Sequence, residues 1–72
     1  MSAALPGCII DLAGEFAEID IGGLTIRADI GLLDHPRPGD WVLLHGGVAL
    51  TRINTQAAGA MLAQLRALDG VK

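Results

Sequence analysis

Pairs of adjacent glycines between short apolar runs restrict the fold of this chain more than any other feature of its sequence. The first pair, Gly22-Gly23, separates residues 15–21 from residues 24–30, and in both runs apolar and polar side chains alternate. This alternation is typical of a strand with one buried face. A glycine pair supplies the positive φ angles that a two-residue turn requires. The sequence therefore predicts a hairpin across residues 15–30.

A second hairpin is predicted around Gly46-Gly47. The pair lies between the apolar run 41–44 and residues 48–54, and a further strand is expected over residues 5–12. Pro6 fits this first strand because proline is tolerated at the start or the edge of a strand. Five strands follow from these patterns.

The longest connection is predicted over residues 31–38. Pro36 and Pro38 interrupt the hydrogen bonding of both helices and strand ladders. We expect at most a short helical turn at residues 31–34.

A C-terminal helix is predicted over residues 55–70. Apolar residues recur at helical spacing on one face, and these are Ala58, Met61, Leu62, Leu65 and Leu68. Asn54 or Thr55 is suited to cap the start of the helix, and Gly70 to end it. The predicted fold class is mainly β, with a small OB-like five-stranded barrel over residues 1–54 and the helix over 55–70, in a single domain of residues 1–72.

Composition excludes several classes of function. The core must be aliphatic, because 51% of the residues are hydrophobic and the only aromatic residues are Phe16 and Trp41. The net charge is −3 and the basic residues are scattered singly, so we expect no nucleic-acid partner. Cys8 is the only cysteine, and no apolar run approaches the roughly 18 residues of a membrane span. We expect a cytoplasmic protein without a membrane partner.

His45 is the candidate functional side chain. It ends the predicted strand 41–44 beside Gly46-Gly47, and an imidazole binds metals or exchanges protons near neutral pH. One imidazole gives no chelate, so a structural histidine at a strand end is the alternative interpretation. The acidic residues lack paired spacing and Ser2 is the only serine. The sequence therefore predicts neither a general acid–base pair nor a serine-histidine-acid set.

Two large side chains leave the choice of buried face open. Trp41 shares a strand face with Leu43 and His45, and the opposite face carries Val42 and Leu44. Either face can be the core. Phe16 lies on the polar side of its strand and is a candidate for an exposed binding residue.

Two blocks of the sequence resemble the HypC/HupF family of nickel-iron hydrogenase maturation chaperones. The N-terminal block matches at Met1, Ala4, Leu5, Pro6 and Gly7. The second block matches at Pro38, Gly39, Asp40, Trp41, Val42, Leu43, His45, Gly47 and Ala49. The resemblance covers nearly the whole chain and agrees with the barrel-plus-helix fold.

The resemblance implies a non-enzymatic assembly factor. Its partners would be a HypD-like scaffold protein and the precursor of a hydrogenase large subunit. No cofactor would be bound intrinsically, and the cargo would be an iron atom with cyanide and carbon monoxide ligands. The family's cysteine at position 2 is the essential thiolate, and the histidine that matches His45 is implicated beside it.

This chain departs from the family at that cysteine, because position 2 is Ser2. A serine hydroxyl stays protonated at neutral pH and is a poor iron ligand, so His45 is the one remaining candidate ligand. Cys8 lies six residues further along, roughly 20 Å in an extended strand, and does not replace it. Three explanations for Ser2 remain open. The cysteine was changed to serine by design, the chain is a divergent paralogue with a metal-free role, or the start site misrepresents the native N-terminus.

The predicted partner-binding surface consists of Ser2, Ala3, Ala4, Leu5, Pro6, His45 and Gly47. The leading hypothesis is a maturation chaperone that helps to deliver the iron unit. A metal-free adaptor that keeps only the protein contacts is the first alternative. An OB-type ligand binder is the second, and the shortage of stacking aromatic residues counts against it.

Overall fold

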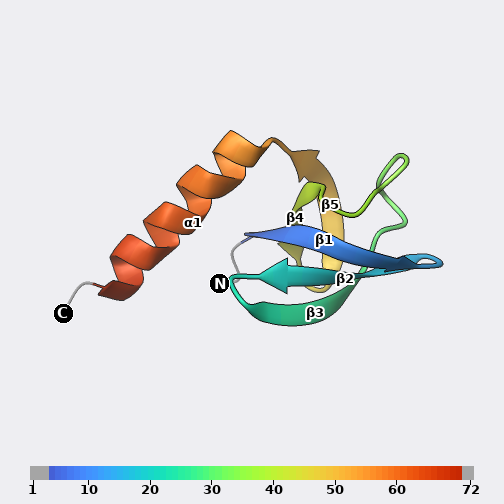
Figure 1. The fold of residues 1–72 in the computed structure, drawn as a ribbon, viewed down its shortest axis with the longest axis horizontal. Coiled ribbons are helices and arrows are strands. Elements are labelled where there is room, and N and C mark those ends of the chain that lie inside the picture. Colours follow the sequence, from blue (N-terminus) through green and yellow to red (C-terminus); the bar gives the residue numbers. More distant parts are fainter. Residues whose placement is uncertain (1–3, 71–72) are drawn as a thin grey trace.

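The computed structural model describes the backbone of residues 4–70 and the side chains of residues 4–65. It forms a closed barrel of five strands followed by one helix (Figure 1), as the sequence predicts. The elements are β1 (Leu5–Ala13), β2 (Phe16–Ile21), β3 (Leu24–Asp29), β4 (Trp41–His45), β5 (Val48–Ile53) and α1 (Thr55–Gly70).

The order of strands around the barrel is β1-β2-β3-β5-β4. β1 pairs antiparallel with β2 on one side and with β4 on the other, so it connects the β2-β3 hairpin to the β4-β5 hairpin. A bulge between Ile9 and Asp11 shifts its register with β2. A bulge increases local twist and bends the strand, which helps a short sheet to close.

The core is aliphatic, as composition predicts. The buried apolar cluster comprises Ile9, Ala17, Ile19, Ala28, Ile30, Val42, Leu44 and Ala49. The alternating runs therefore place their apolar faces inward, except at Leu24 beside the turn, which is exposed. The open choice on β4 is also decided, because Val42 and Leu44 are buried whereas Trp41 and Leu43 are half-buried on the other face.

The connection between β3 and β4 begins with one hydrogen-bonded turn and contains no helix, which stays within the expectation of at most a short helical turn at residues 31–34. Residues 31–35 form a turn and bends, with a backbone hydrogen bond of 3.1 Å from the N–H of Leu33 to the carbonyl of Ile30. His35 adopts a positive φ of 50° directly before Pro36. A proline disfavours the right-handed helical conformation in the residue before it, so the turn does not continue into a helix through His35.

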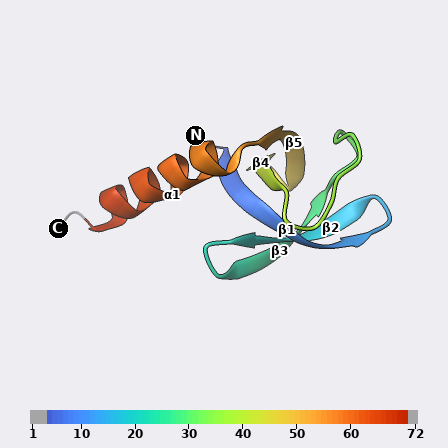
Figure 2. The same cartoon turned by 45° about the horizontal axis from the view of Figure 1, so that its top comes forward.

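Helix α1 is capped by Asn54, one of the two predicted candidates. The side-chain oxygen Oδ1 of Asn54 accepts a hydrogen bond of 2.6 Å from the N–H of Ala57, and its carbonyl accepts the first helical bond from Ala58. This is the usual N-cap geometry. The helix contacts β1 and β4 near its start and then runs beyond the barrel (Figures 1 and 2).

The side chain of Leu68, predicted on the apolar helix face, lies outside the described side chains. Within the described residues, no helix has the length and apolar character needed to cross a membrane.

Candidate functional site

His45 and the beginning of β1 lie side by side at one end of the barrel. β1 and β4 pair antiparallel, with Leu5 opposite Leu44 and Pro6 opposite Leu43. Continuing this register by one residue places Ala4 opposite His45. The side chain of His45 is exposed. The structure therefore brings together two features that are about forty positions apart in the sequence, and this end of the barrel is called the rim below.

The Gly46-Gly47 turn forms the adjoining part of the rim. Both glycines have positive φ angles, 59° and 81°, as a two-residue hairpin between β4 and β5 requires. The carbonyl of Gly47 accepts a hydrogen bond of 2.9 Å from the N–H of Asp29. Because this bond ties the turn to β3, the backbone next to His45 is held by three strands.

The predicted N-terminal binding residues differ in accessibility. Ser2 and Ala3 lie outside the described residues. Ala4 and Leu5 are half-buried, whereas Pro6 is fully buried. The side chain of Pro6 therefore anchors the segment and offers no surface to a partner, which corrects its prediction as a contact residue.

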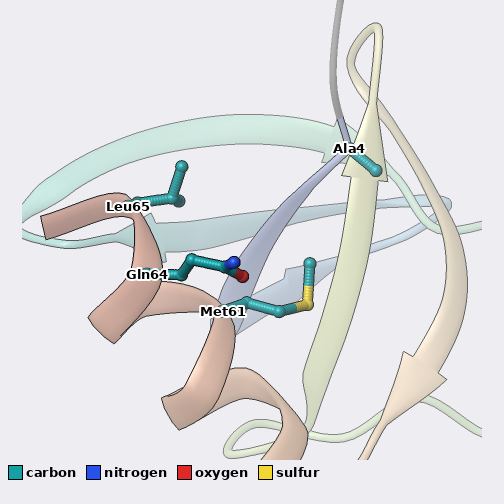
Figure 3. Close-up of a pocket in the computed structure, with 4 residues that line it drawn as sticks. All are labelled: Ala4, Met61, Gln64 and Leu65. Carbon is teal, nitrogen blue, oxygen red and sulfur yellow. The ribbon is translucent and has the colours of Figure 1, made fainter. Parts of the chain in front are cut away.

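A cavity lies between the start of β1 and helix α1, next to the rim. It has a volume of about 130 Å³ and is lined by Ala4, Met61, Gln64 and Leu65. The three helical side chains point from α1 toward the space beside Ala4 (Figure 3). Met61 and Leu65 belong to the predicted apolar helix face, but Gln64 is an unpredicted member. Gln64 lies three residues after Met61, and residues at this spacing are neighbours on a helix surface, so the sequence did contain a signal for its place beside Met61.

Asp40 and Arg52 form an ion pair at the opposite end of β4. A single carboxylate oxygen, Oδ2 of Asp40, accepts bonds from Nη2 of Arg52 at 2.9 Å, from its Nε at 3.2 Å and from the backbone N–H of Arg37 at 3.0 Å. Nη2 of Arg52 also donates to the carbonyls of Asp34 and His35, at 3.0 and 3.2 Å. In the sequence Asp40 was noted only as a match to the second family block, but in the structure it fastens the long connection to β5.

The environment of Asp40 shifts its acidity. Partial burial acts to raise the pKa of Asp40, but the N–H of Arg37 and the guanidinium of Arg52 outweigh burial. The pKa therefore lies below the ordinary value of an aspartate. Asp40 is accordingly ionised at neutral pH, as its role in the ion pair requires.

Cys8 is half-buried on β1. Burial, followed by the negative charges of Asp20 and Asp40, raises the pKa of the Cys8 thiol above its ordinary value. A raised pKa leaves little thiolate near neutral pH, and the thiolate is the form that binds metals or attacks electrophiles. This agrees with the expectation that Cys8 does not replace the missing cysteine at position 2.

The described residues contain no group of three or more histidine, cysteine, aspartate or glutamate side chains arranged to hold a metal ion. A single imidazole offers one nitrogen ligand, so a metal bound by His45 would need its other ligands from elsewhere. His35 lies in the long connection with 92% of its side chain exposed. Phe16 is 37% exposed, and the Arg27 guanidinium lies over its ring at 4.3 Å from the ring centre.

Fold and site together define a class of protein: a five-stranded barrel with a C-terminal helix that presents an exposed histidine beside its N-terminal strand. The HupF/HypC family matches residues 1–65. The chain belongs to the HupF/HypC family.

Curated relatives agree with this assignment. The chain is 32% identical over 78 residues to the hydrogenase maturation factor HypC of Escherichia coli K12, covering 100% of this chain and 87% of that protein. It is 38% identical over 69 residues to HypC of Azotobacter chroococcum mcd 1, covering 94% and 82%. It is also 29% identical over 79 residues to a Frd operon uncharacterized protein C of Proteus vulgaris, covering 100% and 82%.

Proposed function

We propose that this chain is a non-enzymatic factor of nickel-iron hydrogenase maturation that works by docking to other proteins. The proposed partners are a HypD-like scaffold and the precursor of the hydrogenase large subunit. The rim is the proposed contact surface, with His45, Gly47 and residues 2–5 facing the partner. The cargo of the complex is an iron atom with cyanide and carbon monoxide ligands.

The observation that carries this proposal is the juxtaposition of His45 with the beginning of β1. Leu5 lies opposite Leu44, so the start of β1 lies next to an exposed imidazole on a strand that is paired on both sides. A rigid support of this kind fixes the direction of a ligand or contact residue better than a loop does. Neighbouring apolar side chains, Met61 and Leu65, extend the same surface onto α1.

The role of His45 in this proposal is to supply one ligand or contact in a site that a partner completes. A lone imidazole gives no chelate, and iron–carbonyl chemistry favours soft thiolate ligands. The remaining ligands would come from the partner protein. The chain itself would contribute geometry and binding energy and would catalyse no bond cleavage.

Ser2 favours a second candidate function. A serine hydroxyl is a weak ligand compared with a thiolate, so a chain with Ser2 is suited to an adaptor that keeps the protein contacts but carries no iron. The two candidates share the same docking surface. They differ only in whether iron accompanies the complex.

Co-purification from the native host, with iron analysis, tests both candidates. The wild-type chain and the variant Ser2→Cys are each isolated with their bound proteins. Iron present only with Ser2→Cys supports a carrier that lacks its thiolate, whereas stable complexes without iron in either form support the adaptor. Recovery of neither a HypD-like protein nor a large-subunit precursor would contradict the proposed function.

A further inference from the structure

Strand β3 has an incompletely paired edge. On one side, all six residues of β3 pair with β2, from Leu24 opposite Ile21 to Asp29 opposite Phe16. On the other side, within the described part of the chain, β3 meets β5 at a single position, Asp29 opposite Val48. The barrel therefore closes at the last residue of β3, and residues 24–28 form a border with no strand beyond them (Figures 1 and 2).

The register shows which backbone groups point away from β2. In an antiparallel hairpin with a two-residue turn, the pair that flanks the turn exchanges hydrogen bonds, and bonded and non-bonded pairs then alternate. Leu24, Ile26 and Ala28 therefore direct their backbone groups toward β2. Thr25 and Arg27 direct theirs outward. The bond of 2.9 Å from the N–H of Asp29 to Gly47 confirms this alternation, because Asp29 belongs to the outward set.

The open edge is continuous with the rim. Asp29 bonds to the Gly46-Gly47 turn that follows His45, so the edge starts where the rim ends. On β5, the side chain of Arg52 reaches across to the carbonyls of Asp34 and His35 in the connection that precedes β4. The β3 edge therefore borders the proposed docking surface, whereas the contacts of Arg52 fasten the long connection.

The side chains along the edge are also accessible. Leu24 is 66% exposed, Thr25 and Arg27 are exposed, and Ile26 is half-buried. Natural proteins usually cover or charge a strand edge of this length, since it is a template for another strand. Leu24, a large exposed apolar residue, is unexpected on an edge that stays uncovered.

We propose that residues 24–28 of β3 accept an extended segment of the HypD-like scaffold as an additional strand. The occupant follows from the chemistry of the edge, because outward N–H and C=O groups at alternate residues match only another extended backbone. Its apolar residues would pack beside Leu24 and Ile26 on one face. On the other face an acidic side chain would pair with Arg27. This inference rests on the proposed function and names the type of contact that its complex contains.

Amide hydrogen exchange tests the inference on the wild-type chain, alone and bound to the purified HypD-like scaffold. The amides of Thr25 and Arg27 should exchange at least about tenfold more slowly in the complex, because binding gives them acceptors. The amides of Ile26 and Ala28 serve as internal controls, since β2 already protects them. A complex in which Thr25 and Arg27 stay unprotected overturns the inference but leaves the proposed function intact.

Two further outcomes have definite meanings. Absence of any complex with the scaffold contradicts the partner assignment and, with it, the inference. Protection of Thr25 and Arg27 that rises with concentration in the chain alone assigns the edge to a second copy of the chain, and overturns the inference as stated.

A matched pair of variants provides an independent readout. Thr25→Pro removes one outward N–H and leaves the bonds to β2 in place, and proline is tolerated where the lost N–H faces solvent. Thr25→Val changes the side chain but keeps the N–H. We expect about fivefold weaker scaffold binding for Thr25→Pro and wild-type binding for Thr25→Val. A folded Thr25→Pro variant that binds the scaffold as tightly as wild type would overturn the inference. If this variant does not fold, the hydrogen-exchange measurement on the wild-type chain decides whether the inference holds.

Discussion

Gly7 shows how a single residue without a side chain determines the packing where β1 enters the barrel. It is buried, and a Cβ atom at this position would lie 2.5 Å from Cγ2 of Ile19 and 3.0 Å from Cδ1 of Leu44. Ile19 is itself fully buried and cannot move away easily. The match of Gly7 to the N-terminal family block therefore has a steric cause, independent of any role in binding.

We expect Gly7→Ala to lower the free energy of unfolding by about 1–3 kcal/mol, the usual range for overpacking a core. Urea denaturation measures the change. Gly59→Ala is a suitable control, because Gly59 is exposed in α1 and, apart from the adjacent residues and the helix's own backbone, no atom lies within 4 Å of the place that a methyl group would take there. Alanine at this helical position should raise stability by up to about 1 kcal/mol. A Gly7→Ala variant as stable as wild type would contradict the close approach.

The residues next to His45 in the sequence correctly predicted that it ends a strand. The steric constraint on Gly7 could not be predicted in this way. A glycine pair after an apolar run is a local signal, so the neighbourhood of His45 can be inferred from adjacent residues. The constraint on Gly7 comes from Ile19 and Leu44, which are distant in sequence. Only the pairing of β1 with both β2 and β4 brings them together.

At the scale of elements, the connection between β3 and β4 is held by one arginine of β5. Arg52 bonds to the carboxylate of Asp40 and to two carbonyls of the connection, those of Asp34 and His35. The N–H of Gly39 also donates to the carbonyl of Ile9 at 2.8 Å. A connection without regular structure is thereby fixed at both β1 and β5.

Asp40→Asn should lower the free energy of unfolding at pH 7 by about 1 kcal/mol, because Arg52 is partly exposed and water screens the pair. The folded-state pKa of Asp40 is lowered, so its carboxylate stabilises the fold above the unfolded-state pKa of about 3.9. This contribution is lost as pH falls through the folded-state pKa. The stability difference between wild type and Asp40→Asn should therefore shrink below about pH 4.

Denaturation curves of both proteins at a series of pH values on either side of the ordinary aspartate pKa check this expectation. Arg52→Lys is the matched control, since it keeps the charge but loses the forked geometry that reaches three acceptors. It should be destabilised as well. A difference between wild type and Asp40→Asn that stays constant over this series would contradict the ionic role of Asp40.

The elements with regular periodicity could be predicted from the sequence. The contacts that hold the irregular connection between β3 and β4 could not. Alternation placed β2 and β3, and helical spacing with Asn54 placed the start of α1. The short turn expected at residues 31–34 is present as one hydrogen-bonded turn, but the bonds that hold the rest of this connection were not predicted. Arg52 was not predicted either, because its partner Asp40 is twelve residues away and belongs to another part of the chain.

At the scale of the whole molecule, the barrel separates a structural end from the proposed docking end. The long connection with its Asp40–Arg52 pair lies at one end of β4, and His45 lies at the other. The cavity lined by Ala4, Met61 and Leu65 adjoins the second end. Barrel closure was predictable from five short strands, but the single pairing of β3 with β5 was not, because it depends on the register of the whole sheet.

The most direct test of the central claim is the dissociation constant for the HypD-like scaffold, measured for wild type, His45→Ala and His35→Asn. His35 is a matched control because it is highly exposed, lies away from the rim, and has a φ of 50° that asparagine tolerates. We predict that His45→Ala binds at least about tenfold more weakly, as expected for a central contact, and that His35→Asn binds like wild type. Equal affinity of His45→Ala and wild type would contradict the claim that the rim is the docking surface.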